Sequence, residues 1–197
     1  MSGHLIAFEG LDQSGKQTQA EQLHDHLVRE GRECHLLSFP DYDTPVGREI
    51  AHALRSERDY LPDVMQLLYV TNRYEKRERI RSWIEAGAIV LCDRYMASSV
   101  AYGEAQGLDA AWLTDIQRYL PPPSLTILLD IAPATAVERK RTGRDRYERN
   151  LELLSRVRLS YARQAAGTNW LRLDGQRPRD EVSRDVIRAV STRLAQP

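Results

Sequence analysis

The sequence has few of the features that mark secreted, membrane-spanning or polyanion-binding proteins. Its only cysteines, Cys34 and Cys92, lie in apolar runs typical of strands, which favours reduced, buried thiols over a disulfide. No apolar run approaches the ~20 residues that would span a bilayer. The 28 basic residues are balanced by 28 acidic ones, so general binding to nucleic acid is not expected.

The beginning of the chain also lacks the pattern of a secretory signal. "MSGHLIAFEG" has no basic segment ahead of its short apolar stretch. We therefore expect a cytoplasmic protein that does not associate with membranes. Its 197 residues show no linker and no repeat, so residues 1–197 are predicted to form one domain.

Apolar runs and helical patterns alternate along the chain. Strands are predicted at 4–10, 33–39, 88–93, 125–131 and 169–175. Helices are predicted at 16–30, 63–86, 109–119, 134–140, 150–165 and 179–195. Continuous apolar strands that alternate with helices are typical of a parallel sheet covered on both faces, which predicts an α/β fold.

The stretch "FEGLDQSGKQTQ" lies between the first predicted strand and the first predicted helix. It fits the phosphate-binding pattern G-x-x-x-x-G-K through Gly10, Gly15 and Lys16. In such a loop, backbone N–H groups and a helix N-terminus face a phosphate, and the lysine reaches the β- and γ-phosphates. An ordinary glycine-containing turn is the alternative. The predicted ATP-binding residues are Gly10, Leu11, Asp12, Gln13, Ser14, Gly15, Lys16, Gln17 and Thr18.

Gln17 departs from this pattern, because a Ser or Thr at its position normally ligates Mg²⁺. Thr18 follows one residue later and would point about 100° further round the helix. We therefore expect Mg²⁺ to be held mainly by phosphate oxygens, water and a carboxylate, for which Asp12 is the nearest candidate. Lys16 is expected to face solvent.

Four segments in this order resemble the thymidylate kinase family, whose members transfer a phosphoryl group from ATP to dTMP. They are "FEGLDQSGKQTQ", "SFPDYDTPVG" (38–47), "LLYVTNRYE" (67–75) and "CDRYMASSVAYGEAQG" (92–107). The resemblance continues through "LTILLDI", "GRDRYE" and "LDGQRPRDEV", and so covers most of the chain. It implies a P-loop NTPase-type three-layer sandwich around a five-stranded parallel sheet, with a lid at about 138–150. It also implies ATP as donor, Mg²⁺ as cofactor and a homodimer.

The resemblance also implies how dTMP is bound. Arg94 matches the arginine on the acceptor phosphate, Arg73 the arginine at the thymine edge, and Tyr69 the aromatic that stacks on thymine. On helical spacing alone, core packing of Tyr69 is the alternative. Tyr42 stands where many relatives have a phosphate-binding arginine and others have tyrosine. The remaining substrate-binding residues that the resemblance implies are Phe39 and Pro40 in the substrate loop, Ser98 and Ser99 beside the base, and Tyr102 beneath the deoxyribose.

The catalytic residues implied by the resemblance are Asp12, Lys16, Arg94, Arg144 and Arg146. Asp12 matches the loop carboxylate near the sugar 3′-hydroxyl and the metal. Gln13 occupies the place of a catalytic arginine in many relatives, and other relatives take that arginine from the lid, which implicates Arg144 and Arg146. Asp93 is either a water-mediated metal ligand or a structural carboxylate.

Two other functions are compatible with these residues. A related kinase could use another deoxynucleotide or a deoxynucleoside as acceptor. A nucleotide-binding homologue without catalysis could carry Gln13 and Gln17. The presence of Lys16, Arg94 and an arginine-rich lid favours a kinase.

Overall fold

The computed structural model describes residues 3–139 and 150–195. Within these ranges, five strands form a parallel sheet in the order β2-β3-β1-β4-β5. They are β1 (His4–Glu9), β2 (Cys34–Ser38), β3 (Ile89–Asp93), β4 (Leu125–Asp130) and β5 (Trp170–Asp174). The predicted five-stranded parallel sheet of an α/β fold is confirmed.

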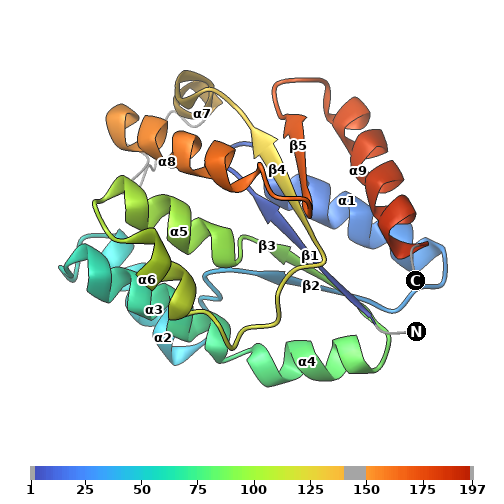
Figure 1. Cartoon of the computed structure of the whole chain (residues 1–197), viewed down its shortest axis with the longest axis horizontal. Coiled ribbons are helices and arrows are strands. Elements are labelled where there is room, and N and C mark those ends of the chain that lie inside the picture. The colour runs from blue at the N-terminus through green and yellow to red at the C-terminus, as the bar shows by residue number, and fades with distance from the viewer. Residues whose placement is uncertain (1–2, 140–149, 196–197) are drawn as a thin grey trace.

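Helices cover both faces of this sheet (Figure 1). The described helices are α1 (Lys16–Arg29), α2 (Pro45–Leu54), α3 (Pro62–Tyr74), α4 (Arg77–Glu85), α5 (Met96–Ala105), α6 (Ala110–Asp115), α7 (Pro133–Arg139), α8 (Leu151–Gln164) and α9 (Arg179–Leu194). Alternate residues of β1 point to opposite faces, as a strand requires. Ile6 and Phe8 pack in one core cluster with α1 and α9, whereas Leu5 and Ala7 pack in another with Ile80 of α4.

The prediction of one helix over 63–86 is wrong, because the chain forms α3 and then α4. The N–H of Lys76 turns back to the carbonyl of Arg73, and the Lys76 ammonium lies 2.7 Å from Asp41. This tertiary contact holds the chain at the end of α3. The highly charged segment has no Gly or Pro that would reveal the break in the sequence.

Two helices near the site, α2 and α5, were not predicted. The start of helix α2 could have been predicted from the sequence. Thr44 caps the N–H of Gly47 at 2.9 Å, and Pro45 occupies the first turn. Helix α5 has no side-chain cap of its own. Its first N–H groups are bonded by Glu9 from β1, a long-range contact that local sequence patterns do not reveal.

The two cysteines are buried free thiols, as the sequence predicted. Among the helices that the structure describes, none has the length and apolarity needed to cross a membrane.

Candidate active site

The candidate site lies where β1 and β3 end side by side. Phe8 of β1 pairs with Asp93 of β3, and the N–H of Arg94 donates to the carbonyl of Phe8 at 2.9 Å. The phosphate loop follows β1, and the "DRY" segment follows β3. Ligands of open parallel sheets bind beyond such carboxyl ends, so the fold brings the two main predicted motifs to one place.

The phosphate loop needs glycine at two points. Gly10 has φ 140° and Gly15 has φ 95°, and residues that carry a side chain rarely adopt these backbone angles. A Cβ on Gly10 would also lie 2.4 Å from the carbonyl oxygen of Leu129. Gly15 immediately precedes α1, so the loop delivers the backbone to the positive N-terminal end of that helix.

Lys16 is buried, and the expectation that it faces solvent is wrong. Its side chain is only 5% exposed, and its ammonium donates to the carbonyl of Leu11 at 2.8 Å. The loop thus folds around its own lysine. Burial, followed by the nearby charge of Arg94, lowers the pKa of Lys16 to about 8.

Gln17 points along α1 and not into the loop. Its amide donates to Glu21 at 2.8 Å on the exposed side of the helix. Thr18 instead lines a hollow with Ser14 and Gly15. Arg139 of α7 lines the same hollow and donates to the carbonyls of Gln13 at 2.9 Å and Gly175 at 3.1 Å.

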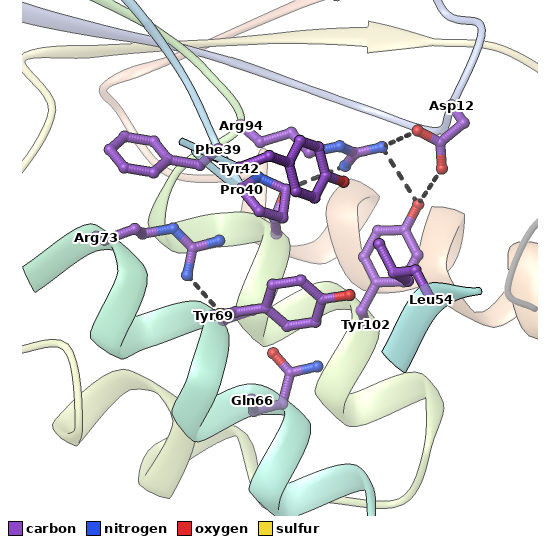
Figure 2. Close-up of a pocket in the computed structure, with 12 residues that line it drawn as sticks. Asp12, Phe39, Pro40, Tyr42, Leu54, Gln66, Tyr69, Arg73, Arg94 and Tyr102 are labelled. Carbon is purple, nitrogen blue, oxygen red and sulfur yellow. Dashed lines mark hydrogen bonds and ion pairs between the residues drawn. The ribbon is translucent and has the colours of Figure 1, made fainter. Parts of the chain in front are cut away.

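A second pocket, which we call the acceptor pocket after the role that the sequence predicts for its residues, is bordered by Asp12. It has an empty volume of about 520 Å³, part of which is open to solvent. Asp12 lines it, together with two residues that were not predicted, Leu54 and Gln66 (Figure 2). All nine predicted substrate-binding residues line it as well: Phe39, Pro40, Tyr42, Tyr69, Arg73, Arg94, Ser98, Ser99 and Tyr102.

Arg94 forms the polar end of the acceptor pocket. It adopts φ 64°, an uncommon conformation for a residue with a side chain. One guanidinium nitrogen donates to Asp12 at 2.6 Å, and the other donates to Ser98 at 3.1 Å. Tyr102 donates to the second oxygen of Asp12 at 3.2 Å. Figure 2 shows the three groups Asp12, Arg94 and Tyr102 meeting at this end of the pocket.

The Asp12–Arg94 pair is electrostatically strong. Burial alone would raise the pKa of Asp12, but the charges of Arg94 and Lys16 outweigh it and hold that pKa well below its ordinary value. Burial would likewise lower the pKa of Arg94, yet Asp12 raises it. Both groups are therefore charged at neutral pH, ready to contact a polyanion and its hydroxyls.

Helix α3 supplies the other end of the pocket. The guanidinium of Arg73 is buried and donates to Ser99 at 2.7 Å. Tyr69 lies one helical turn earlier, and in Figure 2 its ring points from α3 towards Tyr102. Tyr42 is 47% exposed at the rim. Ser99 is thus a partner of Arg73, whereas Ser98 is a partner of Arg94.

Gln66 and Leu54 line the pocket but were missed. Gln66 precedes Tyr69 by three residues and Arg73 by seven, so helical spacing places it on the same face and could have found it. It is 0% exposed, and neither atom of its amide group has a hydrogen-bond partner among the described residues. Leu54 ends α2, which the sequence analysis did not predict.

The described residues offer few side chains that could bind a cation. Within residues 3–139 and 150–195 no three His, Cys, Asp or Glu side chains cluster closely enough to hold a metal. One oxygen of Asp93 is buried without a hydrogen-bond partner there. Burial raises the pKa of Asp93, while Lys16 and Arg94 oppose this. One or two carboxylates suit Mg²⁺, which keeps several waters and binds substrate phosphates.

Arg144 and Arg146 lie outside the described residues, as does most of the predicted lid.

Known proteins resemble this chain in sequence and in fold. A family model described as thymidylate kinase matches residues 8–186. A thymidylate kinase of Schizosaccharomyces pombe is 34% identical over 194 residues, which cover 96% of this chain and 92% of that protein. One from Plasmodium falciparum is 31% identical and covers 99% and 93%. The structure of a thymidylate kinase from Candida albicans superposes with a TM-score of 0.82 at 28% identity, covering 97% of this chain and 92% of that one. The chain therefore belongs to the thymidylate kinase family.

Proposed function

We propose that the chain transfers the γ-phosphoryl group of ATP to dTMP, giving ADP and dTDP. The observation that carries this proposal is the ion pair of 2.6 Å between Asp12 of the phosphate loop and Arg94 of the acceptor pocket. It brings a donor-binding loop and an acceptor-binding arginine into direct contact. Phosphoryl transfer depends mainly on such positioning and on charge neutralisation, so no strong general base is needed.

Each end of the acceptor pocket suits one part of dTMP. Arg94 binds the acceptor phosphate in place of part of its contact with Asp12. Tyr69 stacks on thymine, and Arg73 donates to the base edge while it remains bonded to Ser99. Tyr102 packs against the deoxyribose, where its ring leaves little room for a 2′-hydroxyl. Asp12 accepts from the sugar 3′-hydroxyl.

The phosphate loop binds ATP. Its backbone N–H groups and the N-terminus of α1 contact the phosphates. Lys16 exchanges the carbonyl of Leu11 for the β- and γ-phosphate oxygens. Gln13 cannot supply positive charge, so Arg144 or Arg146 of the lid does so during transfer. Such an arginine can contribute ~10³-fold or more to the rate.

Mg²⁺ fits beside Asp12 and Asp93. The buried oxygen of Asp93, which has no hydrogen-bond partner among the described residues, supports this assignment. When bound, Mg²⁺ supplies neutralisation of phosphate charge. Asp12 and Asp93 would hold it, directly or through water.

The active form is a homodimer. The outward side of α3, opposite the pocket, presents Val64 at 36% exposure and Leu67 at 44%, and Leu61, which precedes the helix, is 71% exposed. A second copy that covers this apolar stripe would stabilise the helix that carries Tyr69 and Arg73. Sedimentation of the parent should give twice the chain mass, and Leu61→Glu with Leu67→Glu should give monomers. A monomeric parent would contradict the dimer.

The remaining assignments concern the whole chain. Residues 1–197 form one kinase domain with its lid at about 138–150, and the enzyme works in the cytoplasm. Two buried free thiols suit a reducing compartment.

A coupled assay of ADP release tests the proposed activity. The parent is given ATP and Mg²⁺ with dTMP, other deoxynucleoside monophosphates or thymidine as acceptor. The highest kcat/KM is expected with dTMP, and omission of Mg²⁺ should abolish turnover. Preference for thymidine or for another monophosphate would identify a related kinase. ATP binding without turnover on any acceptor would identify a nucleotide-binding homologue.

A further inference from the structure

Glu9 is a buried carboxylate at the end of β1 that no step of the proposed reaction uses. It is 0% exposed and surrounded by four hydrogen-bond donors. One oxygen accepts the N–H of Tyr95 at 2.8 Å and the N–H of Ser98 at 3.2 Å. The other accepts the hydroxyls of Ser98 at 2.6 Å and Tyr161 at 3.0 Å. Both oxygens therefore act only as acceptors.

The first oxygen completes helix α5. The backbone N–H groups at the start of a helix have no partner within it. Helix α5 begins without a side-chain cap of its own, and Glu9 of β1 takes that role by accepting the N–H of Ser98 in the first turn of α5. It thereby fixes the segment that directly follows Arg94.

The second oxygen sets the direction of two hydroxyl groups. A hydroxyl has one proton and two lone pairs. Because Ser98 gives its proton to Glu9, a lone pair remains for the guanidinium of Arg94 at 3.1 Å. The same holds for Tyr161, which accepts from the same nitrogen of Arg94 at 3.4 Å. The two hydroxyl oxygens also lie 2.9 Å apart, and when both protons go to Glu9, both hydroxyls are acceptors for Arg94.

We propose that Glu9 is a positioning residue for the acceptor phosphate, acting on Arg94 through the hydroxyls of Ser98 and Tyr161. One guanidinium nitrogen is held by these hydroxyls and by the carbonyl of Gly10 at 3.2 Å, so that the other nitrogen is directed at Asp12 and at the phosphate position. Glu9 reaches the acceptor through other groups and touches no substrate. This role rests on the proposed function.

Glu9→Gln tests the role with almost unchanged shape. In one rotation, the amide oxygen keeps the two backbone N–H groups, but the NH₂ group then faces Ser98 and Tyr161. Their protons must turn towards other neighbours, including Arg94. In the other rotation, the NH₂ group opposes the two backbone N–H groups. The first arrangement removes hydroxyl acceptors of Arg94, and the second displaces the backbone that directly follows Arg94. We expect the KM for dTMP to rise at least ~10-fold and the KM for ATP to change less than ~3-fold.

Tyr161→Phe removes one hydroxyl and keeps Glu9, so it tests the same pathway even where Glu9→Gln fails to fold. The KM for dTMP should rise ~3–10-fold, because Arg94 loses one neutral acceptor. When Tyr161→Phe is added to Glu9→Gln, the KM for dTMP should rise less than ~2-fold further, because the Tyr161 hydroxyl is already misdirected in Glu9→Gln. Glu104→Gln is the matched control, because Glu104 also joins α5 to α8, through Ser160 and Arg163, but away from Arg94. It should leave the KM for dTMP within ~2-fold.

Calorimetric binding of dTMP without ATP gives a readout independent of turnover, and should follow the KM values. Unchanged dTMP binding in Tyr161→Phe, or equal losses for ATP and dTMP in a folded Glu9→Gln, would overturn the positioning role. Fully additive effects in the double variant would overturn it too. A parent that neither binds nor phosphorylates dTMP would overturn the proposed function instead, and the parent assay comes first for that reason.

Discussion

Arg94 and Asp12 form an ion pair of 2.6 Å that joins the end of β3 to the phosphate loop. Only 14% of the Arg94 side chain and 32% of the Asp12 side chain is exposed, so water screens the pair weakly. The ion pair thereby fixes against the phosphate loop the guanidinium that we propose binds the acceptor phosphate.

Arg94→Ala should damage use of the acceptor far more than binding of the donor. A charge-assisted hydrogen bond to phosphate contributes about 1.5–3 kcal/mol, so kcat/KM for dTMP should fall at least ~10-fold. The Kd for ATP should change less than ~3-fold. Steady-state kinetics and calorimetry check this, with Arg94→Lys as a control that keeps the charge. Equal weakening of both ligands would contradict the separate binding sites.

The buried position of Lys16 makes ATP binding sensitive to pH. The pKa of Lys16 is lowered to about 8, so its charge is present below pH 8 and is lost as pH rises through that value. In the free enzyme, kcat/KM for ATP should therefore fall above about pH 8. The variant Lys16→Met should lose at least ~10²-fold in turnover and show no such pH dependence in ATP binding. A constant kcat/KM for ATP up to pH 10 would argue against this.

Gln17 should be dispensable for catalysis. Its amide is bonded to Glu21 on the exposed side of α1, so it contributes nothing to the loop. We expect Gln17→Ser and Gln17→Ala each to change turnover less than ~10-fold, because Mg²⁺ needs few protein ligands. Turnover is measured over a range of Mg²⁺ concentrations. An inactive parent that Gln17→Ser revives would show that the hydroxyl is essential.

Tyr102 should discriminate against a ribose acceptor through its ring and not through its hydroxyl. The parent and Tyr102→Phe should both prefer dTMP over its ribose counterpart, since the ring remains. Tyr102→Ala should narrow this preference. Loss of the hydrogen bond to Asp12 will lower activity modestly in both variants. Competition between the two acceptors in one assay gives the ratio directly. Equal use of both by the parent would remove this role.

Gln66 and Asn72 of α3 offer a matched pair for stability. Gln66 has two buried amide atoms without partners among the described residues, so Gln66→Leu should leave the free energy of unfolding unchanged or raise it by about 1 kcal/mol. Asn72 accepts the N–H of Asp41 and donates to Thr44 and Glu75, so Asn72→Leu should cost about 2–4 kcal/mol. Denaturant unfolding of the ligand-free protein measures both. Similar losses in the two variants would contradict this contrast.

Much of the fold could be predicted, because strands buried on both faces appear as apolar runs. The run at 88–93 corresponds to β3, Ile89–Asp93. The break between α3 and α4 could not be predicted, since it depends on a contact between Lys76 and the distant Asp41. Helix α5 was missed for a related reason, because its N-terminus is completed by Glu9 and not by a neighbouring residue.

The members of the candidate site were easier to predict than their environments. Ordered motifs pointed to residues that the structure gathers around one pocket. Burial of Lys16 could not be read from a loop sequence, because it results from the loop folding back on Leu11. Gln66 could have been found by helical spacing from Tyr69, but the lack of a partner for its amide within the described part of the chain could not.

The hydrogen-bonded pairing of β1 with β3 has a consequence for how the enzyme loses activity. These central strands carry the phosphate loop and Arg94, and Phe8 bonds to the backbone of Arg94 itself. No hinge separates the two segments at this point of the sheet. The distance between the phosphate loop and Arg94 is therefore set by the distance between the two strands. Both segments should lose their structure in the same cooperative unfolding event. During gradual denaturation, affinity for ATP and affinity for dTMP should disappear together, at the denaturant concentration at which the sheet itself melts.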